Sequence, residues 1–213
     1  AGQTPIDIVF GSIRSQSHLG FDNSDVQSKE ILDDLWDKVF RLTKSVSPPS
    51  CIDADGHFLI IHTLVSLQQC SSEMVLLALG RYPHLALEVD AMGRTPLSLA
   101  ASDALIPANK VNALIKGEHL WTHGLSAASV PDTEGRLPLH VAAASGRAYQ
   151  EGLEKILQAE PRALGTRDLR DGMFPFQLAA ISDGEGEERE LVDLESVYLL
   201  LRERPDLLAL YLV

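Results

Sequence analysis

Two stretches carry nearly the same pattern, Thr95-Pro96-Leu97-Ser98-Leu99-Ala100-Ala101 and Leu137-Pro138-Leu139-His140-Val141-Ala142-Ala143. A third, Phe174-Pro175-Phe176-Gln177-Leu178-Ala179-Ala180, keeps the proline and the paired alanines in the same places. Such self-similarity along a chain is the signature of a repeat architecture. Weaker copies lie at Thr4–Phe10 and Leu59–Val65, and a glycine precedes each copy by two or three residues: Gly2, Gly56, Gly93, Gly135 and Gly172.

A second landmark lies downstream of the motifs. Apolar residues stand eight, five and four residues before a proline, so they form one face of a helix. The proline then ends that helix, because it lacks an N–H and crowds the preceding turn. The sets are Val75/Ala78/Leu79 before Pro83, Leu153/Ile156/Leu157 before Pro161 and Val197/Leu200/Leu201 before Pro205, with Val111/Leu114/Ile115 before His119 in place of a proline.

The spacing between the two landmarks tests the alignment. The first apolar residue follows the motif by ten residues in three consecutive copies, at Val75, Val111 and Leu153. The longer intervals of the first and last copies predict loop insertions at Ser15–Lys29 and Asp183–Glu190. Each unit is therefore a turn, a short helix and a second amphipathic helix.

The residues of the motif suit this unit. Glycine supplies the positive φ of a tight turn, and proline fits the first helical position, where Thr95 can cap the helix. Helices this short are marginal in water, so they must bury their apolar faces against neighbouring units. We predict an all-α fold, a single array over residues 1–213 with repeats at about 1–52, 53–89, 90–131, 132–167 and 168–213.

These residues resemble the ankyrin repeat, whose signature is T-P-L-H-x-A at a period of about 33 residues. Leu137–Ala143 with Gly135 and Gly146 is the best match, whereas only some copies keep the Thr or the His, and the second helices end at proline. The resemblance implies an ankyrin-like helical-repeat solenoid of about five repeats. It also implies that His62 and His140 bond to the backbone of the adjacent turn.

Composition limits the partners. The 213 residues carry a formal charge of −12, which disfavours nucleic acid and anionic membranes, and no apolar run is long enough for a spanning helix. Two cysteines make no disulfide framework, which indicates the cytoplasm or another reducing compartment. The chain starts at Ala1 and ends in the apolar segment Leu207–Val213, so we expect a fragment or subunit of something larger.

No catalytic, metal-binding or cofactor-binding residues are predicted, and we expect no enzyme. Nucleophilic catalysis needs a base beside Ser or Cys, and no such set is visible. His123 stands four positions after His119, but two ligands alone rarely make a metal site. Gly184-Glu185-Gly186 is surrounded by acids and lacks the lysine of a phosphate loop. The acidic stretch Asp183–Glu195 is either a solvated insertion or a docking strip for a basic partner.

The resemblance implies that a protein partner binds the turn tips and the exposed side of each first helix. Met at a tip is an adaptable contact, and Arg94 and Arg136 recur at one position, where they could offer a ladder of donors to carboxylates. Trp36 is expected in the core, and Trp121, in the connection Gly117–Pro131, anchors an insertion or serves as a contact. The candidates are Asp55, His57, Met92, Arg94, Ser102, Asp103, Glu134, Arg136, Ala144, Ser145, Met173, Ile181 and Trp121.

Two functions follow from this pattern. The first is a non-catalytic scaffold that binds a protein partner through the turn tips and first helices. The alternative is a structural subunit embedded in a large assembly, which contacts its neighbours through the insertions and the apolar tail. Under the alternative, the isolated chain should aggregate unless Leu207–Val213 is covered.

Overall fold

The computed structural model describes residues 11–12, 26–48, 51–121, 126–182 and 194–209, and these residues form helices joined by turns, with no strand among them. The only extended pairing in these ranges is an isolated bridge between Ile52 and Phe58. The all-α prediction is confirmed for this part of the chain. The α-helices are α2 (Val26–Val46), α3 (Ile60–Ser66), α4 (Ser72–Arg81), α5 (Pro96–Ser102), α6 (Ala108–Trp121), α7 (Pro138–Ala144), α8 (Leu153–Ala159), α9 (Pro175–Ile181), α10 (Leu194–Glu203) and α11 (Asp206–Ala209).

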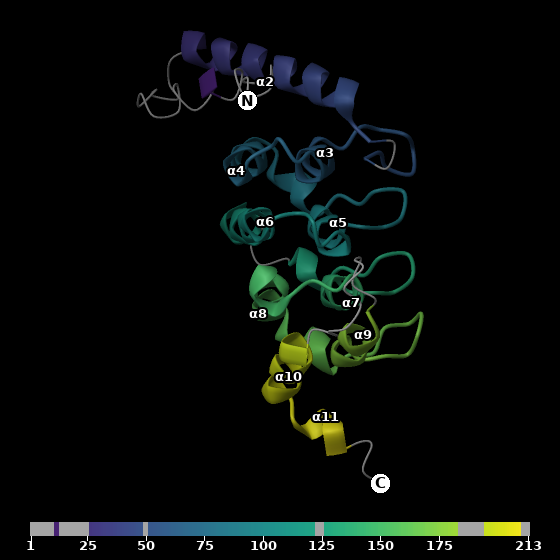
Figure 1. Cartoon of the computed structure of the whole chain (residues 1–213). Coiled ribbons are helices and arrows are strands. Elements are labelled where there is room, and N and C mark those ends of the chain that lie inside the picture. Colours follow the sequence, from purple (N-terminus) through teal and green to yellow (C-terminus); the bar gives the residue numbers. More distant parts are fainter. Residues whose placement is uncertain (1–10, 13–25, 49–50, 122–125, 183–193, 210–213) are drawn as a thin grey trace.

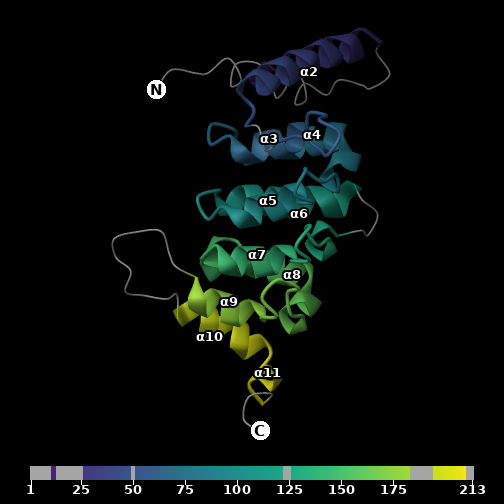
Figure 2. The same cartoon turned by 90° about the vertical axis from the view of Figure 1, so that its right-hand side faces the viewer.

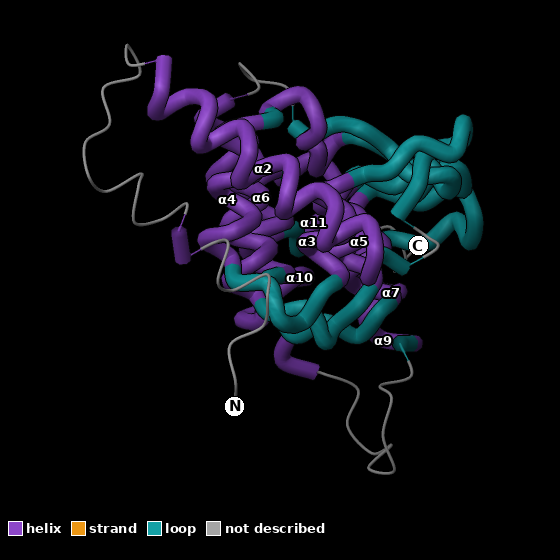
Figure 3. The backbone as a smooth tube through the Cα atoms, turned by 90° about the horizontal axis from the view of Figure 1, so that it is seen from above, coloured by secondary structure: helices purple, strands orange, loops and turns teal. Residues whose placement is uncertain are grey.

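The helices are arranged in two columns (Figure 1). The short helices α3, α5, α7 and α9 lie above one another, and each packs on the next. Beside them, α4, α6 and α8 form the second column, and α10 continues it against α9. Figure 2 shows the same pairs as successive layers, with α2 lying across α3 at one end. The loops that precede the short helices all project from one side of this stack (Figures 1 and 3).

The short helices begin as the motif predicts. Pro96, Pro138 and Pro175 each occupy the first turn of α5, α7 and α9, where the missing N–H costs nothing. Thr95 accepts a hydrogen bond from the N–H of Ser98 and so caps α5. In α7 and α9 the bond runs the other way along the chain, since His140 and Gln177 accept the N–H groups of Leu137 and Phe174, the residues directly before these helices.

The second helices end at the predicted prolines. α4 ends at Arg81 and α8 at Ala159, and Pro83 and Pro161 each open a 3-10 helix, η1 (Pro83–Ala86) and η4 (Pro161–Gly165). Two further 3-10 helices are η2 (Ala127–Ser129) and η3 (Tyr149–Glu151). In α6 no proline follows, and the helix continues through His119 to Trp121. The predicted connection Gly117–Pro131 is therefore wrong over its first five residues.

The predicted N-terminal loop insertion also extends too far toward the C-terminus. α2 begins at Val26, so the last four residues of the predicted loop Ser15–Lys29 are helical. Trp36 is buried, as predicted, and its ring meets that of Tyr82 edge to face at 5.8 Å. The motif Thr4–Phe10, the insertion Asp183–Glu190, most of the acidic stretch, His123 and the last four residues lie outside the described residues.

The core runs along the stack between the two columns. The paired alanines Ala100/Ala101 and Ala142/Ala143 are fully buried, which lets successive short helices approach closely. The predicted faces of the second helices, such as Val75, Ala78 and Leu79, are buried against them. None of the helices in the described ranges is both long and apolar enough to cross a bilayer.

Candidate interaction surface

The turns before α5 and α7 are built around an aspartate. One carboxylate oxygen of Asp90 accepts the N–H groups of Met92 and Arg94, each at 2.9 Å. The other oxygen receives the guanidinium of Arg94, with Nε at 2.9 Å and Nη2 at 2.7 Å. Asp132 repeats every bond with Glu134 and Arg136, with distances of 2.9–3.0 Å. Each turn is therefore closed by a buried carboxylate that holds two backbone donors and one cation.

This geometry corrects the expectation for Arg94 and Arg136. Their guanidinium groups bind the aspartate of their own turn, and their side chains are only 13% and 19% exposed. They are not an open ladder of donors for a partner, and their first role is to hold the turn. The sequence contained a signal for this, because an aspartate stands four residues before each arginine.

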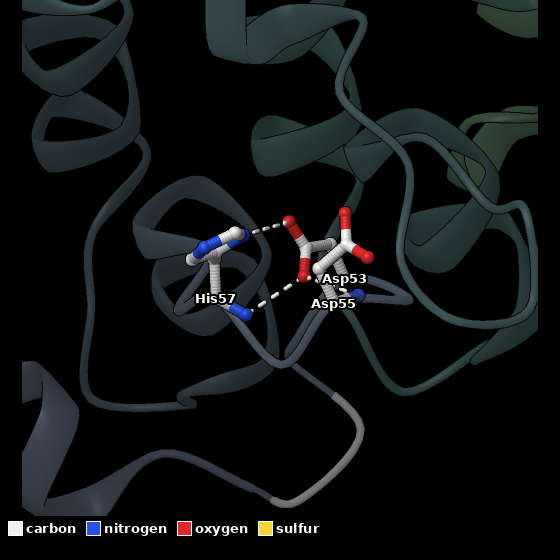
Figure 4. Close-up of side chains that lie close together, drawn as sticks. All are labelled: Asp53, Asp55 and His57. Carbon is white, nitrogen blue, oxygen red and sulfur yellow. Dashed lines mark hydrogen bonds and ion pairs between the residues drawn. The ribbon is translucent and has the colours of Figure 1, made fainter.

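The turn before α3 has the same arrangement around an aspartate, with a histidine in place of the arginine (Figure 4). Asp53 accepts the N–H groups of Asp55 at 2.9 Å and of His57 at 2.7 Å, and its second oxygen lies 2.9 Å from Nδ1 of His57. The hydrogen bond from the His57 backbone is the main cause that lowers the pKa of Asp53. The ligand atoms of Asp53, Asp55 and His57 lie within 4.8 Å of one another. Both oxygens of Asp53 already serve the turn, so this proximity follows from the turn and assigns no metal site.

The turn before α9 has the aspartate without the cation. Asp168 accepts the N–H groups of Met173 at 2.9 Å and of Asp171 at 3.2 Å. Met173 stands where His57, Arg94 and Arg136 stand in the other turns, directly after the glycine. Its side chain is half-buried and packs against the core, so the expectation of a solvent-facing tip is wrong for Met173.

Successive turns are bonded to one another in a row. The N–H of Ala91 donates to Ile52 O at 3.0 Å, and Thr133 donates its N–H and its hydroxyl to Met92 O at 3.1 and 2.9 Å. Glu134 continues the row through an ion pair with Arg170 at 2.9 Å. Because each turn is fixed internally and tied to the next, the tips form one continuous surface rather than independent loops.

The glycines of these turns provide a direct test of the stacking. A Cβ on Gly93 would lie 2.9 Å from the backbone nitrogen of Thr133, whereas a Cβ on Gly56 meets nothing within 4 Å, and both glycines have positive φ. We expect Gly56→Ala to cost about 1 kcal/mol through backbone strain and Gly93→Ala about 2–3 kcal/mol through strain and clash. Urea unfolding of both variants measures the difference, and equal losses would contradict the stacked row.

The exposed residues of the row are varied. Met92 is 50% exposed, and Asp55, His57 and Glu134 are exposed beside it along the row, as expected for residues at turn tips. Leu169, which the sequence reasoning missed, is the most exposed large apolar residue of the described chain, at 82%. Its signal is an apolar residue directly after the turn aspartate.

Some of the candidates at the ends of the short helices are exposed, and others are half-buried and hydrogen-bonded within the stack. Asp103, Ala144 and Ile181 are exposed, with Ile181 at 60%. Ser145 is half-buried, and its hydroxyl donates to Ala101 O of the preceding helix at 2.9 Å. Ser102 is likewise half-buried and bonds within its own helix. Trp121 closes α6, and its side chain lies outside the described residues.

The buried histidines act as the resemblance implies. Nε2 of His62 lies 2.8 Å from Arg94 O, and Nε2 of His140 lies 2.8 Å from Thr166 O, so each imidazole donates to the backbone of the following turn. Nδ1 of His140 accepts the N–H of Leu137, which requires the neutral ring. Burial lowers the pKa of both histidines.

This arrangement predicts a pH dependence of stability. Because the folded pKa lies below the unfolded value near 6.5, the unfolded chain binds more protons, so stability is full above about pH 6.5 and falls as the pH drops below it. In His140→Gln the amide can replace the ring, as Gln177 does in α9, without titrating. We expect its stability to fall less than that of the wild type between pH 7 and 5.5 in urea titrations. Identical slopes would contradict the assignment.

No protein-family model and no curated protein matches the chain.

Proposed function

We propose that this chain is a non-catalytic scaffold of the ankyrin type, in which about five helix pairs form a divergent repeat solenoid that binds a protein partner. The single observation that supports it best is the row of aspartate-anchored turns. In these turns an aspartate carboxylate accepts backbone N–H groups and so holds the tip rigid. The exposed residues of the tips, by contrast, differ from turn to turn. A rigid surface with variable side chains binds with little loss of conformational entropy.

The contact residues we assign are exposed at the tips, and their side chains do not bind the turn aspartates. Met92, Glu134 and Leu169 are exposed on three consecutive tips, and Asp103, Ala144 and Ile181 are exposed at the C-terminal ends of α5, α7 and α9. The net charge of −12 favours a protein partner over nucleic acid. Arg94 and Arg136 support this surface indirectly, because they fix the turns that present it.

A specific observation also supports the alternative, a subunit embedded in a larger assembly. α10 exposes Leu194 at 67% and Tyr198 at 63%, on the column opposite the turn tips. A groove of about 320 Å³ lies next to it, between α8, η4 and the end of α10, and includes Tyr149, Leu157 and Leu164. Neighbours would then contact the helical side instead of the turns.

Affinity capture from a source extract with two matched triple variants separates these functions. The tip variant carries Met92→Ser, Glu134→Ser and Leu169→Ser. The α10 variant carries Leu194→Ser and Tyr198→Ser in α10 and Arg162→Ser in the neighbouring η4. All six residues are exposed. We expect proteins retained by the wild type to be lost with the tip variant and kept with the α10 variant. The reverse pattern would support the assembly subunit, and retention by both variants would contradict the tip surface.

A further inference from the structure

The second carboxylate oxygen of Asp168 is buried without a donor. Asp168 is only 2% exposed, its Oδ1 accepts two backbone N–H groups, and its Oδ2 has no hydrogen-bond partner among the described residues. A buried acceptor that lacks a donor costs free energy, so this oxygen is a place where a donor from outside would be stabilising.

The other turns show which group fits there. The residue after the glycine donates its backbone N–H to the aspartate in all four turns, and in three of them its side chain also carries a cationic or imidazole group to the second oxygen. Arg94 and Arg136 place both Nε and Nη2 on that single oxygen. Met173 supplies no such donor, so the fourth turn has the acceptor half of a pair that the chain completes elsewhere.

The arginines nearest in sequence to Asp168 are directed elsewhere. The guanidinium of Arg167 lies over the ring of Phe174, 4.8 Å from its centre, and Arg170 pairs with Glu134 at 2.9 Å. The turn is also open where the two turns directly before it are covered. Gly93 and Gly135 meet Thr133 and Leu169 of the next turn, whereas a Cβ on Gly172 meets nothing within 4 Å.

We propose that the Asp168 turn is the receptor for an arginine side chain of the protein partner. This inference rests on the proposed scaffold function and names the chemistry of one contact within it. The partner's guanidinium enters beside Met173, whose flexible thioether can move aside, and binds Oδ2 through two N–H groups as Arg94 binds Asp90. A lysine would make a single bond and fits less well.

Titration of the whole chain with N-acetyl-arginine amide, followed through backbone amide NMR signals, tests this site. We expect saturable shifts at Asp171 and Met173 with a dissociation constant on the order of millimolar, as for a single charged contact made by a small ligand. N-acetyl-citrulline amide, which is neutral and nearly isosteric, should leave those signals unchanged. No response to the arginine amide, or an equal response to both compounds, would overturn the proposal.

Two variants make the test specific. Met173→Arg should fill the site from within, raise Tm by roughly 2–4 °C and abolish the shifts. Arg94→Met should open the same acceptor at Asp90 and add a second set of shifts at Met92. Shifts that persist in Met173→Arg would overturn the proposal. The titration uses no partner protein, so its failure rejects the arginine site alone, whereas failure of the tip variant in affinity capture rejects the scaffold function.

Discussion

Replacing Arg147 by methionine is expected to lower the free energy of unfolding by about 3–5 kcal/mol. Arg147 follows α7 and is only 2% exposed, yet the hydrogen-bond partners of its guanidinium among the described residues are carbonyls and not carboxylates. It donates instead to four backbone carbonyls: Ala100 O, Asp103 O, Ile106 O and Glu151 O. Methionine fills much of the volume but supplies no donor, so these buried acceptors would be left without partners.

Urea unfolding at pH 7 measures this loss. Arg170→Met is the matched control, because Arg170 is more than half exposed and its ion pair is expected to contribute less than about 1 kcal/mol. Arg147→Lys should fall between the two, since it keeps the charge but not the planar fork. A loss below about 1 kcal/mol in Arg147→Met would show that the carbonyls find other donors.

The contact that Arg147 makes, a buried cation that donates to backbone carbonyls at the end of a short helix, occurs a second time in the stack. Lys110 of α6 is also buried and donates to Leu64 O, Val65 O and Leu67 O at the end of α3. Arg147 does the same at the end of α5 from the layer below. A cation from the following unit thus closes the C-terminus of the preceding short helix, where unpaired carbonyls and the helix dipole favour positive charge. Burial lowers the pKa of the Lys110 ammonium, but the three carbonyls offset part of that cost.

Sequence reasoning could not identify these two cations. Lys110 lies within α6 and Arg147 precedes α8, so the two cations do not occupy equivalent positions in their helix pairs. Each looks like an ordinary surface residue, because the carbonyls it serves at the end of the preceding short helix lie more than 40 residues away in the chain. By contrast, the helix bounds could be predicted, since Pro96, Pro138 and the turn glycines act locally through φ and a missing N–H.

The candidate surface was predicted only in part for a related reason. The tips were located correctly because Asp55, Met92 and Glu134 lie between an aspartate and a glycine, within one local turn. The roles of Arg94 and Met173 depend on the direction of a side chain relative to an aspartate on the far side of that turn. The same sequence position therefore contains a turn anchor in one unit and a core contact in another.

Substitution of a turn aspartate tests how much of the surface depends on this geometry. Asp132→Ala is expected to cost about 2–4 kcal/mol, because two backbone N–H groups lose their acceptor and Arg136 loses the carboxylate that holds it. Asp168→Ala removes two backbone acceptor contacts but no cation, and it also removes the unpaired oxygen, so about 1–2 kcal/mol is expected.

Thermal and urea unfolding of the two variants side by side give the comparison, and both should also be tested in affinity capture. In Asp132→Ala the tip carrying Glu134 loses the bonds that fix it, so partner retention should weaken although no exposed contact residue has changed. Equal stability losses in the two variants would mean that Arg136 contributes nothing to its turn. Full partner retention by a destabilised but folded Asp132→Ala would mean that the tips bind without being held rigid, since rigidity is what the anchored carboxylate provides.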